Sequence, residues 1–130
     1  MIVDSSVLVA VLTGEPDAEH YLDLMIGADH LVVSAAGLVE SSVVLEARAG
    51  AEAVTDLQAL LADLEADVLP LDEDQAILAS QAWSRFGKGR HLAGLNLGDL
   101  FAYAAASGLG EPLLFKGDDF AQTDIPSADH

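Results

Sequence analysis

The chain has 130 residues, 52% of them hydrophobic, which is enough for one globular domain with a hydrophobic core. No apolar run reaches the roughly 18 residues of a membrane span, no basic segment precedes the apolar start, and there is no cysteine, so we expect a cytoplasmic protein without disulfides. The formal net charge of −17, from 22 acidic and 5 basic side chains, should repel nucleic acid unless metal ions or local basic residues intervene.

The first part of the chain predicts two strands that are each followed by helices. In chain order, the pattern predicts a buried strand over Ile2–Asp4, helices over Ser6 to about Leu12 and Asp17 to about Ile26, a strand over His30–Ser34 and a helix over Ala35–Arg48. Gly50 should end the last of these helices. The next helix, over Ala51–Glu65, is clearly amphipathic because its leucines recur at i, i+3, i+4 and i+7.

The remaining part continues the alternation of strands and helices. It predicts, in order, a strand over Asp67–Leu71, a helix from an Asp72 cap to about Phe86, a helix from Leu97 to about Ser107, a strand over Pro112–Phe115, and a poorly ordered tail over about 121–130. Strands separated by helices indicate a parallel sheet covered on both faces. We therefore expect a single α/β domain over residues 1–130.

Most acidic residues belong to solvated helix faces or to helix starts, where negative charge is favourable. Three acids do not fit that description. Asp4 ends a buried strand, Glu40 lies inside the apolar segment AAGLVESSVVLEA, and Asp99 lies in LNLGDLFAYAAA. A further pair, Asp118 and Asp119, follows the last strand in LLFKGDDF.

These acids can meet at one edge of the sheet, because ligands of open α/β sheets bind beyond the carboxyl ends of the strands. Several carboxylates there could not all stay ionised without cations between them, and oxygen ligands suit Mg²⁺ or Mn²⁺. Taken singly, each acid has a simpler interpretation. Asp4 and Asp99 could be helix N-caps, and Glu40 could pair with Arg48 or with a backbone amide.

Four segments, in this order, resemble a PIN domain of the VapC type, a toxin ribonuclease: VDSSVLVAVL, LVESSVVLEAR, LNLGDLFAYAAA and LLFKGDDFAQTDI. The resemblance extends over essentially the whole chain. It implies a single PIN-like domain, an α/β/α sandwich with a central parallel sheet. It also implies a Mg²⁺-dependent endoribonuclease, with Mn²⁺ as a substitute, that leaves a 5′-phosphate and a 3′-hydroxyl.

The resemblance assigns roles to particular residues. It implies that Asp4 and Asp99 bind the metal, that Ser6 supports Asp4 by a hydrogen bond, and that Glu40 is a third catalytic acid. Many PIN domains carry a fourth acid two residues past the last strand and another two residues later. Here those positions are Gly117 and Asp119, so we assign Asp119, with Asp118 as its possible substitute.

These groups predict hydrolysis by metal-activated water, without a side-chain nucleophile. Four of the five basic residues flank the proposed site: Arg85, Lys88 and Arg90 precede Asp99, and Lys116 precedes Asp118. We expect Lys88, Arg90 and Lys116 to bind RNA phosphates. Arg85 either does the same or complements a helix C-terminus.

The resemblance further implies partners. They are the RNA substrate, a small VapB-type antitoxin with a basic segment, and a second copy of the chain in a homodimer; no membrane is involved. An acidic cleft agrees with an antitoxin that inserts Arg or Lys where the metal would bind.

Two other classes share some of these features. A haloacid-dehalogenase-like phosphatase also has an Asp after its first strand, but it needs a second acid where Ser6 stands, and it leaves Glu40 unexplained. A receiver domain is acidic, with a late Lys after a strand, but it carries paired acids where Ser5 follows Asp4. Both remain alternatives at this point.

Overall fold

Four short parallel strands form the centre of the computed structural model, which describes residues 1–129. The strands are β1 (Ile2–Val3), β2 (Val32–Ser34), β3 (Asp67–Leu69) and β4 (Leu113–Leu114), in the spatial order β3-β2-β1-β4. β1 pairs in parallel with both β2 and β4, and β2 with β3. The first strand therefore lies in the middle of the sheet, where its C-terminal end is surrounded by other elements.

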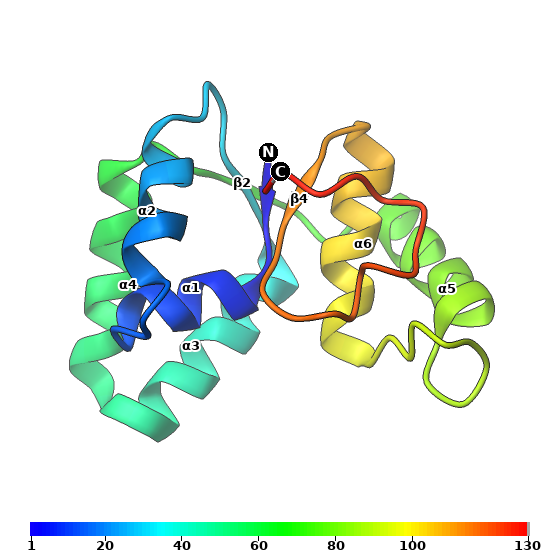
Figure 1. The fold of residues 1–130 in the computed structure, drawn as a ribbon, viewed down its shortest axis with the longest axis horizontal. Helices are drawn as coiled ribbons and strands as arrows, with labels where there is room; N and C mark the ends of the chain where they lie inside the picture. Colours follow the sequence, from blue (N-terminus) through cyan, green and yellow to red (C-terminus); the bar gives the residue numbers. More distant parts are fainter. Residues whose placement is uncertain (130) are drawn as a thin grey trace.

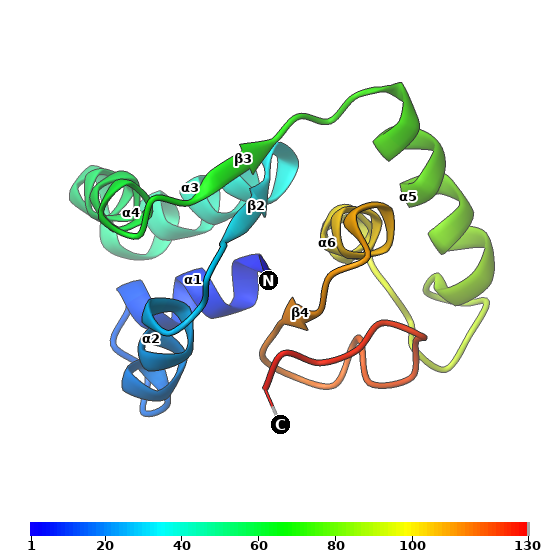
Figure 2. The same cartoon turned by 90° about the horizontal axis from the view of Figure 1, so that it is seen from above.

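Helices cover both faces of the sheet (Figures 1 and 2). One layer contains α1 (Ser5–Leu12), α2 (Ala18–Ile26), α3 (Ala35–Ala49) and α4 (Ala51–Asp63). On the other side α6 (Leu97–Leu109) packs on the strands, and α5 (Glu73–Phe86) packs on α6. This arrangement confirms the predicted α/β/α sandwich with a central parallel sheet. No helix within residues 1–129 is long and apolar enough to cross a membrane.

The strands separate two hydrophobic cores because successive side chains point to opposite faces. Ile2, Val32 and Leu113 belong to the core shared with α5 and α6. Their neighbours Val3, Val33 and Leu114 belong to the core shared with α1 to α4. Every strand is thus buried on both faces except β3, whose Asp67 and Val68 are exposed at the edge of the sheet.

The strands are shorter than predicted for local chemical reasons. β1 ends at Val3 because Asp4 already serves as the N-cap of α1. β3 ends at Leu69 because Pro70 has no N–H to donate to a neighbouring strand. α6 extends to Leu109, two residues beyond the prediction, and ends where Gly110 adopts a left-handed conformation with φ of 65°.

The C-terminal segment differs from the poorly ordered tail predicted over about 121–130. The backbone of Leu113 donates to Pro126 O at 3.0 Å and accepts from Ala128 N at 2.9 Å, so this segment pairs with the outer edge of β4. The phenol of Tyr103 donates to Asp124 Oδ1 at 2.6 Å and fixes the segment to α6. An open strand edge favours such pairing, which the polar sequence of the segment does not reveal. His130 lies outside the described residues.

Replacing Tyr103 by Phe is expected to lower the free energy of unfolding by about 1 kcal/mol, because a half-buried hydrogen bond is lost. The hydrogen bond from Tyr103 lowers the pKa of Asp124. The contribution of ionised Asp124 to the free energy of unfolding is therefore present above pH 4. It is lost as the pH falls through the lowered folded-state pKa of Asp124. Urea unfolding of both proteins at pH 7 and pH 3 checks this, and an equal difference at the two pH values would contradict it.

Candidate active site

Asp4 lies at the C-terminal end of the central strand, and its carboxylate is held by Ser6. Its Oδ2 accepts from the backbone N–H of Ser6 at 3.1 Å and from the Ser6 hydroxyl at 2.5 Å. The Ser6 hydroxyl in turn accepts from the backbone N–H of Lys116 at 3.0 Å. Burial raises the pKa of Asp4, the Ser6 hydrogen bonds oppose this rise, and the negative charge of Glu40 adds to it. The N-cap interpretation and the site interpretation are thus compatible, because Asp4 caps α1 and still faces another acid.

Glu40 reaches the same region from α3. It accepts a short hydrogen bond from the Ser5 hydroxyl, and its carboxylate lies directly against Gly98 of α6. A Cβ atom at Gly98 would overlap the Glu40 carboxylate, so only glycine permits this approach. The proposed ion pair between Glu40 and Arg48 is absent among the ion pairs of residues 1–129.

Asp99 is fixed by a capping box at the start of α6. The Asn96 side chain accepts from Asp99 N, and Asp99 Oδ2 accepts from Asn96 N, both at 3.0 Å. Asn96, and not Asp99, is therefore the N-cap. Asp99 is only 8% exposed, and burial raises its pKa to about 7, with the charges of Asp119 and Asp4 adding to the rise.

Asp119 is the acid of the final loop that lies against the others. Its carboxylate lies close enough to Asp99 for its negative charge to add to the rise in the pKa of Asp99. Asp118 and Asp119 are both exposed to solvent, so exposure does not distinguish them, but the charge that raises the pKa of Asp99 is that of Asp119. The geometry thus favours Asp119 over Asp118 as the fourth acid.

The four predicted acids are brought together from four segments that are distant in the sequence. The charge of Glu40 acts on Asp4, and the charges of Asp4 and Asp119 act on Asp99. The Glu40 carboxylate also lies against Gly98, the residue before Asp99. The group has only oxygen donors, and the burial and mutual repulsion of its acids favour a bound cation. Within residues 1–129, however, no three Asp, Glu or His side chains already stand in a metal-ligating arrangement. The donor chemistry fits a hard divalent cation.

The predicted RNA-binding residues differ in whether their charges are already paired with acidic side chains. The Lys116 ammonium is already paired with Glu15 at 3.1 Å and with Asp17 at 3.0 Å. Lys88 and Arg90 are exposed and form no ion pair within residues 1–129. Lys116 thus has two competing partners that Lys88 and Arg90 lack.

The structure also places the other two arginines, Arg85 and Arg48. Arg85 contacts Asp124 at 3.5 Å and Tyr103, which supports a structural role. Arg48, which the sequence places away from the site, lines a cavity of about 290 Å³ beside Ser5 and Glu40.

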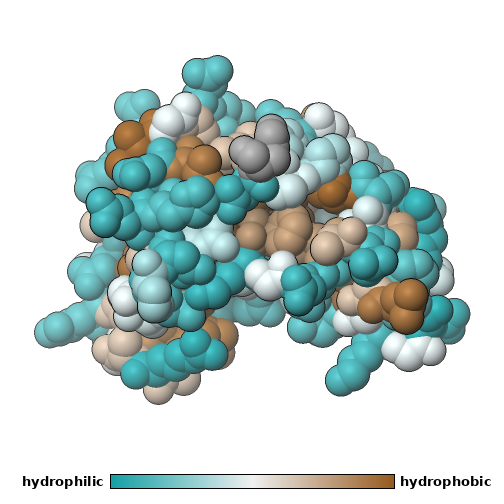
Figure 3. Space-filling model, viewed as in Figure 1, coloured by the Kyte–Doolittle hydropathy of each residue, from teal (hydrophilic) through white to brown (hydrophobic). Residues whose placement is uncertain are grey.

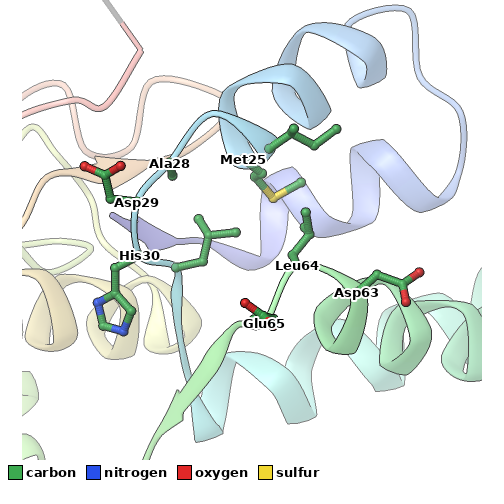
Figure 4. A pocket seen from close by; sticks show the side chains of 9 residues that line it. Met25, Ala28, Asp29, His30, Asp63, Leu64 and Glu65 are labelled. Carbon is green, nitrogen blue, oxygen red and sulfur yellow. The ribbon is translucent and has the colours of Figure 1, made fainter.

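A larger cavity, of about 560 Å³, lies at the opposite end of the strands (Figure 4). Among its lining side chains, Asp29 and Asp63 point to opposite sides. The His30 side chain instead forms a hydrogen bond with Asp67, with 2.6 Å between His30 Nε2 and Asp67 Oδ2. The titratable groups of this cavity do not converge, so we assign no site there.

The comparison with known families is decisive. The PIN domain profile matches residues 1–126. The chain belongs to the PIN-domain family. This PIN domain is 45% identical over 126 residues to ribonuclease VapC30 of Mycobacterium tuberculosis, with 96% of this chain and 95% of that protein covered. It is 44% identical to ribonuclease VapC of Mycolicibacterium smegmatis, with 96% and 97% covered.

Solved structures share the fold of this PIN domain at low sequence identity. Mycobacterium tuberculosis VapC20, described as a toxin that cleaves the sarcin-ricin loop, superposes with a TM-score of 0.79 at 18% identity and 95% coverage of both chains. A toxin–antitoxin complex from Klebsiella pneumoniae superposes with a TM-score of 0.70 at 15% identity, with 95% of this chain and 92% of that one covered. Family membership makes the phosphatase and receiver alternatives wrong.

Three contributors to the geometry of the PIN-domain site were missed by sequence reasoning. Ser5 holds Glu40, Asn96 fixes Asp99, and Gly98 makes room for Glu40. The Asn-x-x-Asp spacing is a recognisable capping-box signal. The contacts of Ser5 and Gly98 with Glu40 connect distant segments, so no local pattern reveals them.

Proposed function

We propose that this protein is a metal-dependent endoribonuclease and the toxin of a toxin–antitoxin pair. The observation that carries this proposal is the meeting of Asp4, Glu40, Asp99 and Asp119 at the carboxyl ends of the strands, in a chain that is 45% identical to a VapC ribonuclease. Asp4 and Asp99 would hold the divalent cation, Mg²⁺ with Mn²⁺ as a substitute. Carboxylates whose pKa values are raised mainly by burial, and further by neighbouring negative charges, are well suited to this role.

The chain's own residues divide the remaining work. When bound, a divalent cation polarises the scissile phosphate and lowers the pKa of a bound water. Ser6 keeps Asp4 in one orientation, and the capping box does the same for Asp99. Glu40 and Asp119 would orient the attacking water, and one of these two carboxylates would accept its proton as the phosphorus–3′-oxygen bond breaks. The leaving 3′-oxygen would take a proton from solvent. The hydrolysis leaves a 5′-phosphate and a 3′-hydroxyl.

Incubation of the pure protein with total RNA, with Mg²⁺ or with a chelator, tests the proposed activity. We expect cleavage only in the presence of Mg²⁺ or Mn²⁺, and mapping of the cut ends should find 5′-phosphates. Equal cleavage in the presence of the chelator would contradict the metal-dependent mechanism. Asp99→Asn serves as the control for contaminating nucleases.

Charge reversal of the loop ahead of Asp99 is expected to weaken RNA binding. Lys88 and Arg90 are exposed and unpaired with acids within residues 1–129, so they are available to phosphates. The double variant Lys88→Glu/Arg90→Glu should bind RNA at least about tenfold more weakly and with a lower salt dependence. Fluorescence anisotropy at several salt concentrations measures both. A variant with wild-type RNA affinity would show that RNA enters by another route.

The proposed partners follow from the same interpretation. An antitoxin with a basic segment, of the VapB type, would place Arg or Lys among the four acids and exclude the cation. We also propose a homodimer that acts in the cytoplasm. If a small reading frame adjoins the gene, its co-expression with this protein, followed by purification and mass measurement, checks the antitoxin and the homodimer. A stable complex that cleaves no RNA is expected.

A further inference from the structure

Trp83, the only tryptophan of the chain, lies on the surface of α5 beside the loop that leads to Asp99. The residue is 40% exposed to solvent. The guanidinium carbon of Arg90 lies over the indole ring, 4.1 Å from its centroid. An exposed indole with a cation on one face has a packed side and an open side.

The loop fixes the Trp83–Arg90 pair in place. Lys88 N donates to Leu95 O and Leu95 N donates to Phe86 O, both at 2.9 Å, which closes the loop on itself. Gly87 packs so tightly on the indole that a Cβ atom there would lie 2.7 Å from Trp83 Nε1. Because this loop is closed and its glycine touches the ring, little side-chain entropy remains to be lost when a ligand binds.

Trp83 also borders an open, mainly apolar cavity. Trp83 lines a cavity of about 370 Å³ together with Ser80, Leu97 and Leu100. Leu97 is 70% exposed and also lines a second apolar cavity, which includes Glu40 and Gly98. Leu97 therefore joins the cavity that contains Glu40, one of the four acids, to the cavity that contains the indole.

We propose that Trp83 is a stacking site for a base of the RNA substrate, with Arg90 and Lys88 holding the adjacent phosphates. This inference rests on the proposed ribonuclease function. Proteins recognise single-stranded RNA by stacking unpaired bases on aromatic rings beside cationic side chains. Here the ring, two exposed cations and an apolar cavity that Leu97 joins to the cavity of Glu40 occur together, in a chain that is otherwise strongly acidic. Trp83 would then position the strand and influence which sequence is cut.

Intrinsic fluorescence tests this proposal directly, because Trp83 is the only tryptophan. The wild-type protein is titrated with single-stranded RNA in a chelator, so that no cleavage occurs. We expect saturable quenching that follows the anisotropy of a labelled strand, and protection of the indole from acrylamide. Binding detected by anisotropy with no change in tryptophan emission would overturn the proposal.

Substitutions separate stacking from packing. Trp83→Leu should weaken RNA binding about tenfold and alter the cleavage pattern, while Trp83→Phe, which keeps a ring, should retain most of both. Ile77→Ala, at another exposed apolar position of α5, is the matched control and should change neither. A Trp83→Leu protein with wild-type RNA affinity and cut sites would overturn the proposal. So would a changed oligomeric mass with unchanged RNA affinity, since it would indicate a protein contact.

Failure of the proposed function gives a different result. If the wild-type protein cleaves RNA and the Trp83 variants cleave it identically, only the stacking site is wrong. If the wild-type protein neither binds nor cleaves RNA, the ribonuclease function itself is wrong, and the stacking proposal with it.

Discussion

Asp99→Asn is expected to abolish RNA cleavage while making the metal-free protein more stable at neutral pH. The amide can still accept from Asn96 N, so the capping box at the start of α6 is kept. What is lost is a negative charge that is buried beside Asp119 and Asp4. In a merely structural carboxylate, the same substitution would lower stability or leave it unchanged.

The pH dependence of this gain follows from the raised pKa of Asp99. Its folded-state pKa is about 7 against an ordinary value of 3.8, so the folded state binds the proton more tightly. The associated stabilisation is fully present below about pH 4 and is lost as the pH rises through 7. Asp99→Asn should therefore gain about 1 to 3 kcal/mol over the wild type at pH 8 and almost nothing at pH 4.

Urea unfolding in a chelator at the two pH values measures this effect, and an RNA cleavage assay with Mg²⁺ measures the activity. Asp56→Asn removes the same charge from an exposed position of α4 and is the matched control. It should change neither quantity. A fully active Asp99→Asn protein would refute the metal-site hypothesis.

Gly98→Ala is expected to lower RNA cleavage about 100-fold in a protein that remains folded, because displacement of a catalytic group by about 1 Å has costs of this order. The new Cβ would overlap the Glu40 carboxylate, so Glu40 must leave Ser5 and the neighbourhood of Asp4. The effect on activity is thus transmitted from α6 to α3 through one glycine. Cleavage assays and circular dichroism of the same preparation measure activity and folding.

Gly37→Ala is the matched control for this substitution. Gly37 lies in the first turn of α3, where a Cβ atom would meet only the Ser34 Cβ, at an ordinary 3.8 Å. Alanine there should stabilise the protein by about 0.5 to 1 kcal/mol and leave activity unchanged. Equal activities of the two alanine variants would show that the position of Glu40 does not matter.

The elements could be predicted from the sequence where strong local signals exist. Apolar runs gave the strands, and the Asp72 cap of α5 is present as expected, with Asp72 accepting from Gln75 N at 2.9 Å. The ends of the strands were overestimated because their termination depends on neighbours, such as the capping role of Asp4. The final segment looked disordered because its sequence is polar, and its partner β4 supplies the missing hydrogen bonds.

In the candidate site, too, local signals were predictable from the sequence and contacts between distant segments were not. Asp4, Glu40 and Asp99 could be selected because acids are unexpected in apolar segments. Which of the two consecutive aspartates acts on Asp99 depends on the course of a loop, which the sequence does not specify; in the structure the charge of Asp119 raises the pKa of Asp99. The ion pairs of Lys116 with Glu15 and Asp17 join residues about 100 positions apart and could not be read from the sequence.

The division into two cores means that the proposed active site belongs to neither half of the chain. Asp4 and Glu40 come from the segments that build one core, whereas Asp99 and Asp119 come from the segments that build the other. A chain split between β3 and α5 would place two of the acids on each fragment. Catalysis would then require the fragments to recombine through the parallel sheet, so recovered RNA cleavage would report their reassembly.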